Sequence, residues 1–114
     1  MKYLLQIYDD GALAEFGRRT PEEQDAIVRE FDAITRSPGI VAGEQLQPVD
    51  TSTTVRVQGG KTLLSDGPFI DAKEHVGGFY LIEADELDEA LEIAARIPVA
   101  RMGGAVEVRP VLER

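Results

Sequence analysis

Apolar side chains occupy both sets of alternating positions in two short segments, residues 2–8 and 78–83. In the first segment, one set is Tyr3, Leu5 and Ile7, and the other is Leu4, Gln6 and Tyr8. In the second segment, Phe79 and Leu81 alternate with Tyr80 and Ile82. Successive side chains of a strand point to opposite faces, so each segment is predicted as a strand that is mainly apolar on both faces. Because helices can cover only one face, we expect a second copy of the chain to cover the other in a homodimer.

A helical spacing of apolar residues follows Thr20. Pro21 suits the first helical position, and Glu23, three residues after Thr20, completes a capping box. The apolar residues that recur at helical spacing are Ile27, Phe31 and Ile34. The run Ser37-Pro38-Gly39 ends this predicted helix. A polar loop that begins at Asp9-Asp10-Gly11 is expected to precede it.

A second helix is predicted after residue 84. Asp85 can cap its first turn, and Pro98 ends it because a proline restricts the residue before it. Its apolar stripe is Leu87, Ala90, Leu91, Ala94 and Ile97.

Two further strand signals complete the order of elements. Residues 53–58 alternate, Gly59-Gly60 is a hairpin turn signal, and residues 61–64 form the returning strand. Residues 105–109 are a last predicted strand, with Pro110 at its end or at a sheet edge. Two helices on one face of a largely antiparallel sheet give an α+β, ferredoxin-like β-α-β-β-α-β fold with an extra hairpin. No linker or composition shift divides the chain, so residues 1–114 are predicted to form one domain.

The balance of charged residues limits the classes of binding partner that are expected. Asp and Glu total 21 against 12 Lys and Arg, so the net charge is −9 at pH 7. Such a surface repels phosphate backbones and anionic lipid, and neither nucleic acid nor a membrane is expected as a partner. The absence of cysteine excludes disulfides, thiolate nucleophiles and cysteine-rich zinc sites. The apolar run Tyr3-Leu4-Leu5 is too short for a signal peptide, and no run approaches the ~20 residues of a membrane span, so a cytoplasmic location is expected.

The turn Ser65-Asp66-Gly67-Pro68-Phe69 is the most distinctive segment of the chain. Asp66 can hydrogen-bond the backbone two residues on, Gly67 tolerates unusual dihedral angles, and Pro68 stiffens the turn. Phe69 is expected to reach the core. The alternative to this structural role is a base or polar anchor at Asp66, held on a rigid turn beside a cavity.

His75 is the only histidine of the chain. It is a candidate general acid or base, and an exposed loop residue before a strand is the alternative. A metal site would need carboxylates such as Asp66 or Glu74 as further ligands, so neither metal nor cofactor is expected. Tyr3, Tyr8 and Tyr80 are candidates for the wall of a ligand pocket on the uncovered sheet face, with packing in a dimer interface as the alternative.

An ordered series of segments resembles the DGPF branch of the YCII-related proteins. The series is Ser65-Asp66-Gly67-Pro68-Phe69, Lys73-Glu74-His75-Val76-Gly77-Gly78, Leu87-Asp88-Glu89-Ala90-Leu91 and Val106-Glu107-Val108-Arg109-Pro110, with Gly43-Glu44-Gln45-Leu46-Gln47-Pro48 also fitting. The resemblance implies a dimeric α+β barrel of ferredoxin-like subunits. In the wider group a His-Asp pair in a cleft is a proposed active site, but the first helix and its approach hold no histidine in this chain. Relatives of the branch are often associated with extracytoplasmic-function sigma factors.

Two hypotheses of function follow. The first is a homodimer that binds a small organic molecule and carries out acid–base chemistry of a lyase or isomerase kind. In it, Asp66 is the base or anchor, His75 is a second proton-transfer group, and Tyr3 and Tyr80 bind the ligand. The second is a non-catalytic regulatory or accessory module whose acidic surface contacts a basic protein partner, such as a transcription factor.

Overall fold

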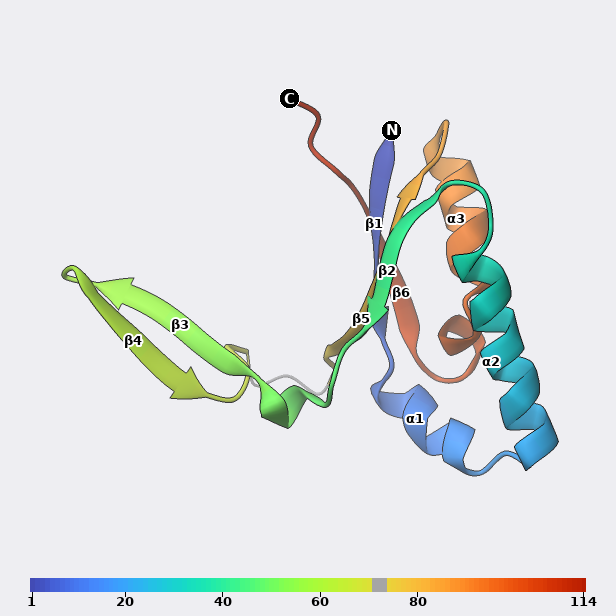
Figure 1. The fold of residues 1–114 in the computed structure, drawn as a ribbon, viewed down its shortest axis with the longest axis horizontal. Coiled ribbons are helices and arrows are strands. Elements are labelled where there is room, and N and C mark those ends of the chain that lie inside the picture. Colours follow the sequence, from blue (N-terminus) through green and yellow to red (C-terminus); the bar gives the residue numbers. More distant parts are fainter. Residues whose placement is uncertain (71–73) are drawn as a thin grey trace.

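Four strands form the main sheet of the computed structural model, which describes residues 1–70 and 74–114. They are β1 (Lys2–Tyr8), β2 (Ile40–Gln45), β5 (Val76–Glu83) and β6 (Ala105–Pro110), in the spatial order β2-β5-β1-β6. Every neighbouring pair is antiparallel (Figure 1). This order, with helices between β1 and β2 and between β5 and β6, confirms the ferredoxin-like α+β fold.

The helices α2 (Pro21–Thr35) and α3 (Leu87–Arg96) lie on one side of the sheet (Figure 1). The sheet contributes Tyr3, Leu5, Ile7, Tyr80 and Ile82 to the core on that side, and the helices contribute Ile27, Ile34, Ala90 and Ala94. The 3-10 turn η2 (Pro98–Arg101) follows α3 and adds buried Val99. The alternation along β1 and β5 therefore has a direct structural cause, since every second side chain enters this core.

None of the described helices lies on the opposite side of the main sheet, and we call this side the open face. Leu4 lies opposite Leu81 and Gln6 lies opposite Phe79 on it, and all four side chains are only partly buried. Nearer its β6 edge, the hydroxyl of Tyr8 donates to Glu107 at 3.0 Å, which with burial raises the pKa of Tyr8 above its usual value. Because β1 and β5 are apolar on both faces, the open face of a single chain is a partly apolar surface that is accessible to solvent.

The capping signals of the two predicted helices have different outcomes. The capping box before α2 is confirmed: the hydroxyl of Thr20 accepts from the Glu23 backbone N–H, and the Glu23 carboxylate accepts from the Thr20 backbone, both at 3.2 Å. The prediction that Asp85 caps α3 is wrong. The cap position is Glu86, without a side-chain hydrogen bond, and the backbone N–H of Asp85 instead donates to Glu89.

Two elements were missed from the sequence. The segment predicted as a polar loop forms the helix α1 (Asp10–Gly17), because Ala12 and Phe16 recur at helical spacing and pack against the core. The strand β2 has mostly exposed side chains and contains Gly43, so its pattern is weak. A Cβ atom at Gly43 would lie 2.5 Å from the ring of Tyr80, which explains why this strand has no side chain there.

The predicted hairpin is confirmed as β3 (Thr53–Gln58) and β4 (Lys61–Asp66), joined by Gly59 and Gly60 with positive φ angles of 56° and 77°. It forms a separate two-stranded sheet that follows the 3-10 turn η1 (Val49–Thr51). We call residues 53–66 the arm. Figure 1 shows that the arm stands away from the main sheet, on the side opposite the helices.

None of the described helices is long and apolar enough to cross a bilayer. Lys73, which begins the second segment of the family-like series, lies outside the described residues.

Candidate ligand cavity

A cavity of about 490 Å³ lies on the helix-covered side of the sheet. Its walls come from α1, α2, the end of β1 and the two strands β2 and β5. It exists because α2 and α3 do not fill the space above the β2 edge of the sheet, where two cavity-lining positions, Gly43 and Gly78, have no side chains. The volume falls within the range of small-molecule sites, about 300–1,000 Å³.

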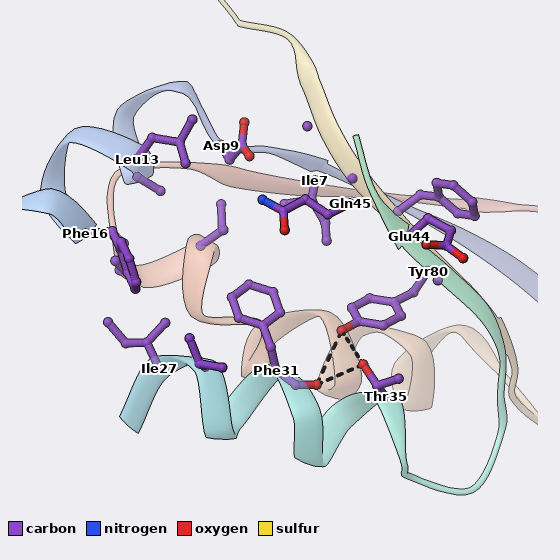
Figure 2. A pocket seen from close by; sticks show the side chains of 18 of the residues that line it. Ile7, Asp9, Leu13, Phe16, Ile27, Phe31, Thr35, Glu44, Gln45 and Tyr80 are labelled. Atoms are coloured by element: carbon purple, nitrogen blue, oxygen red, sulfur yellow. Dashed lines mark hydrogen bonds between the residues drawn. The ribbon is translucent and has the colours of Figure 1, made fainter. Parts of the chain in front are cut away.

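Most of the cavity wall is apolar. Its apolar side chains include Ile7, Leu13, Phe16, Ile27, Phe31 and Met102. Figure 2 shows the ring of Phe31 reaching from α2 into the middle of the cavity, and Phe16 closing the α1 end. Phe16, Ile27 and Phe31 also belong to the apolar stripes that pack α1 and α2 against the sheet. A ligand would therefore be held mainly by apolar contact.

The polar groups at one corner of the cavity form hydrogen bonds with one another. The hydroxyl groups of Tyr80 and Thr35 lie 3.0 Å apart, and both also lie near the backbone carbonyl of Phe31, at 3.5 and 3.0 Å (Figure 2). A carbonyl oxygen has two lone pairs, so the Phe31 carbonyl can accept from these hydroxyl groups although it lies within α2. The network fixes the Tyr80 ring, which makes Tyr80 a rigid wall of the cavity.

Asp9 provides the second polar feature of the cavity. It follows the last residue of β1 and directly precedes α1, so the change from strand to helix places its carboxylate at the cavity rim (Figure 2). Gly77 packs against this carboxylate so closely that a Cβ atom would overlap it. Burial raises the pKa of Asp9, a hydrogen bond from its own backbone opposes this, and the nearby charge of Asp10 adds to the increase. Asp9 is thus a carboxyl group suited to hold or move a proton.

The charge of the lining is negative. Asp9 and Asp32 are the carboxylates that face this region, whereas the side chain of Glu44 points to the other side of β2 in Figure 2. Gln45 points into the cavity and offers a neutral amide (Figure 2). No Lys or Arg belongs to the lining among residues 1–70 and 74–114. The cavity therefore favours a neutral ligand over an anionic one.

His75 forms a pair with Asp10 beside this site. The His75 Nδ1 atom lies 3.6 Å from the Asp10 carboxylate, and the His75 backbone N–H donates to the same carboxylate. The Nε2 atom is buried and has no hydrogen-bond partner among the described residues. Neither residue lines the cavity, but each is close in sequence to one that does, Asp9 and Gly77.

The structure does not bring the predicted pair Asp66 and His75 to one cavity. Asp66 is the last residue of β4, it is exposed, and it is absent from the cavity lining. Of the described residues, Asp10 is the carboxylate in ion-pair distance of His75. The roles of Asp66 and His75 in catalysis stay predictions, and their geometry favours two separate environments.

The turn after Asp66 differs from the prediction in two respects. The residue two positions after Asp66 is Pro68, which has no backbone N–H, and the Asp66 side chain forms no hydrogen bond with the described residues. Gly67 has a φ of 95°, as expected for a glycine before proline, and its backbone bonds to Ser52 and to the hydroxyl of Thr54, at 2.7 and 2.8 Å. The expectation that Phe69 reaches the core is wrong. Phe69 is 65% exposed and lies against the guanidinium of Arg56, 4.5 Å from the ring centre, because the turn lies at the base of the arm and not at the core.

The predicted tyrosine positions are also corrected. Tyr3 and Tyr80 lie on the helix-covered face and are buried, so the expectation that they line a pocket on the uncovered face is wrong for both. The alternation of side chains along β1 and β5 does not indicate which face of the sheet the helices cover, because both faces are mainly apolar. Tyr80 nevertheless lines the cavity, whereas Tyr3 is part of the core away from the lining. Tyr8 is the tyrosine of the open face.

Sequence reasoning missed Asp9, Phe31 and Thr35 as cavity residues. A signal for Asp9 was present, since two acidic residues directly follow an apolar strand. No signal marked Thr35, whose position depends on where α2 crosses β5. Within the described part of the chain, no group of three His, Asp or Glu residues has the arrangement of a metal site.

Comparisons with known proteins agree with this fold. A family model described as YCII-related domain matches residues 1–114. The uncharacterised protein R00369 of Rhizobium meliloti (strain 1021) is 34% identical over 117 residues, which cover 97% of this chain and 92% of that protein. The uncharacterised protein YjpA of Bacillus subtilis (strain 168) is 46% identical over 50 residues, 44% of this chain and 55% of that protein.

A solved structure has the same fold. It is 5-chloro-2-hydroxyhydroquinone dehydrochlorinase (TftG) from Burkholderia phenoliruptrix AC1100 in complex with 2,5-dihydroxybenzoquinone. The TM-score is 0.52 with 18% sequence identity, over 100% of this chain and 96% of that chain. At this identity the likeness concerns the fold alone.

Proposed function

The chain belongs to the YCII-related family, and from that premise we propose that it binds a small, neutral, mainly apolar organic molecule and moves a proton on it. The observation that carries the proposal is the cavity of about 490 Å³ with the Asp9 carboxyl at its rim. Apolar walls provide affinity, and one titratable group at a fixed place provides chemistry.

Asp9 is the proposed proton-transfer group. Because burial raises its pKa, the carboxyl is easier to protonate than an exposed aspartate and is a stronger base once ionised. The neighbouring Asp10–His75 pair is a second proton-transfer group in the proposal, with Asp10 orienting the imidazole through Nδ1. A proton taken from carbon by Asp9 and returned elsewhere is an isomerase step, and loss of a leaving group after its removal is a lyase step.

The fold neighbour supports this class of chemistry by analogy. That protein is named a dehydrochlorinase and its structure contains 2,5-dihydroxybenzoquinone, a six-membered ring compound. A ring of that size is compatible with the volume of the cavity in this chain. The analogy supports a reaction class on this fold and does not identify the substrate.

The open face supports a second part of the proposal, a homodimer. Leu4, Phe79 and Leu81 leave apolar surface on this side of the sheet in a single chain. A second copy stacked on this face would remove that surface from water and complete a dimeric α+β barrel.

Ligand binding is tested with phenol as a neutral ring and benzoate as an anionic ring. We expect phenol to shift the backbone amide NMR signals of Ala12, Gly77 and Gly78, and benzoate to bind at least about tenfold more weakly because of the acidic lining. Val28 lines the cavity and is 49% exposed, so Val28→Trp fills the space without removing core. Arg29→Trp, at the next residue outside the lining, is the matched control. Equal phenol binding by the two variants would contradict the cavity as the site.

Proton transfer is tested with cyclohexanone in D₂O. Protein-dependent deuterium incorporation next to the carbonyl, followed by NMR, is expected for the unmodified chain and should fall about 10²–10⁴-fold in Asp9→Asn. Asp66→Asn is the control, and a loss in this variant instead would assign the base to Asp66. Absence of exchange in the unmodified chain would contradict proton abstraction from such a ketone, whether or not phenol binds.

A further inference from the structure

The arm carries an apolar surface that residues 1–70 and 74–114 of its own chain do not cover. In its register, Val55 lies opposite Leu64 and Val57 opposite Thr62, so these side chains share one face of the hairpin. Val55, Val57 and Leu64 are 59%, 67% and 68% exposed. The other face holds Arg56 and Leu63, with Phe69 packed on Arg56. We call the side with Val55, Val57 and Leu64 the apolar face of the arm.

The arm is held at its base and not at its tip. Gly67 closes the base, because its backbone N–H donates to the Ser52 carbonyl and its carbonyl accepts from the Thr54 hydroxyl. The tip is the turn Gly59-Gly60, where no described atom lies close enough to contact an added Cβ atom. A two-stranded hairpin by itself is at best marginally stable in water, so an arm of this kind gains stability when its apolar face is covered.

The charge of the arm points to a partner that is acidic. Residues 53–66 contain Arg56 and Lys61 against Asp66, a net charge of +1 in a chain with a total of −9. A second copy of this chain offers such an acidic body, and attraction between arm and body offsets the repulsion between two acidic bodies. This complementarity favours a second copy over a basic or neutral protein.

The direction of the arm is also compatible with a second copy. Figure 1 shows the arm leaving the base of β2 and β5 on the side of the open face, which the helices do not cover. A molecule seated on the open face therefore comes within reach of the arm. The open face and the arm would be covered by the same partner.

We propose that the arm of each copy packs its apolar face against the second copy, which is seated on the open face. This rests on the homodimer part of the proposed function and is independent of the ligand cavity. Each arm thereby extends the dimer contact beyond the two stacked sheets. The exposed Val55, Val57 and Leu64 become interface residues, and Arg56 and Lys61 are brought to the acidic body of the partner.

The test compares Leu64→Glu with Ser65→Glu in the full-length chain. Both positions are exposed in β4, both changes add one negative charge, and the two side chains lie on opposite faces of the arm. We expect the unmodified chain and Ser65→Glu to sediment as dimers at micromolar concentration. Leu64→Glu should raise the dimer dissociation constant at least about tenfold, because it places a charge in an apolar contact. Circular dichroism of both variants verifies that the body remains folded.

Three results would overturn the inference or separate it from the proposed function. If Leu64→Glu and Ser65→Glu dimerise equally well, the arm does not contact the partner, and a dimer through the open face alone remains. If the unmodified chain is a monomer at these concentrations, both the arm contact and the proposed dimer fail, whereas phenol binding in the cavity is unaffected. If Leu81→Glu on the open face leaves the dimer intact while Leu64→Glu breaks it, the second copy contacts the arm but does not lie on the open face. This result would contradict the proposed position of the second copy.

Discussion

The body and the arm both contain strands with apolar side chains, but the body buries these side chains and the arm leaves them exposed. In the body, Leu5 and Ile82 are fully buried between the main sheet and the helices. In the arm, Val57 and Leu64 are about two-thirds exposed, because none of the helices and strands that the structure describes lies over them. The difference shows that alternating side chains are compatible with a strand in both regions. Whether the apolar side chains are buried depends on which other elements of the chain cover that face of the strand.

The two regions also differ in what sets their register. In the body, the shared core fixes the pairing of β1 with β5, since a shift by one residue would expose Leu5 and Tyr80. In the arm, the two-residue turn at Gly59-Gly60 fixes the pairing without help from a core. The body can therefore hold a cavity within one copy, and the arm is suited to contact another molecule.

The largest difference between the regions is expected from truncating one leucine in each. Leu5→Ala removes a fully buried side chain and should lower the free energy of unfolding by about 2–5 kcal/mol. Leu64→Ala should change it by no more than about 0.5 kcal/mol in the monomer. Urea unfolding followed by circular dichroism at the lowest usable protein concentration measures both values. Similar losses for the two variants would mean that the arm is packed against its own body.

A smaller effect is expected at the cavity rim. Gly77→Ala places a methyl group where the Asp9 carboxylate lies, and should cost about 1–3 kcal/mol of unfolding free energy. Gly17→Ala at the end of α1 is the matched control, since its Cβ atom meets nothing within 4 Å. That control should be neutral or stabilise the protein by up to about 1 kcal/mol. Thermal unfolding of the two variants distinguishes close packing at Gly77 from a general effect of adding a methyl group.

The start of α2 should contribute less than the cavity rim. Thr20→Ala removes the hydroxyl that accepts from the Glu23 backbone N–H, at a cost of about 1 kcal/mol. Ser65→Ala, at an exposed hydroxyl residue on the other face of the arm, is the comparison and should be close to neutral. Both values come from urea unfolding at pH 7. A Thr20→Ala variant as stable as the unmodified chain would mean that water replaces the cap without loss.

The smallest expected effect is the dependence of stability on the protonation of Asp9. The pKa of Asp9 is raised in the folded chain, so folding favours the protonated form, and this contribution is lost as pH rises through the folded pKa. Asp9→Asn lacks the titration. Its stability relative to the unmodified chain should therefore increase from acidic pH toward neutral pH. Unfolding at a series of pH values measures this difference, and a constant difference would contradict the raised pKa.

Much of the fold could be predicted because local signals agreed with the final packing. The capping box at Thr20, the turn at Gly59-Gly60 and the alternation in residues 2–8 all correspond to observed elements. The helix α1 and the strand β2 were missed for a shared reason. Both are short, and glycines at Gly11 and Gly43 interrupt their patterns where another part of the chain comes close.

The candidate site was less predictable than the fold. Asp66 lies in a distinctive turn, but that turn ends the arm, and the described geometry gives it no place in the cavity. Asp9 had a weaker signal and lies at the rim, because its surroundings come from β1, α1 and β5. Asp10 and His75 form a pair although they are 65 positions apart in the sequence. The residues around either one give no indication of this contact.

By itself, the sequence determined the strands and helices other than α1 and β2, and the order in which they follow one another. It also determined that β1 and β5 have more apolar faces than the helices can cover, since these features follow from residue spacing along the chain. Only the tertiary structure decided which face of β1 and β5 the helices cover, that a cavity stays open above β2, and that the arm stands clear of the body. The reason is physical: spacing fixes which side chains share a face, whereas a cavity and an exposed surface depend on the distances between elements that are remote in sequence.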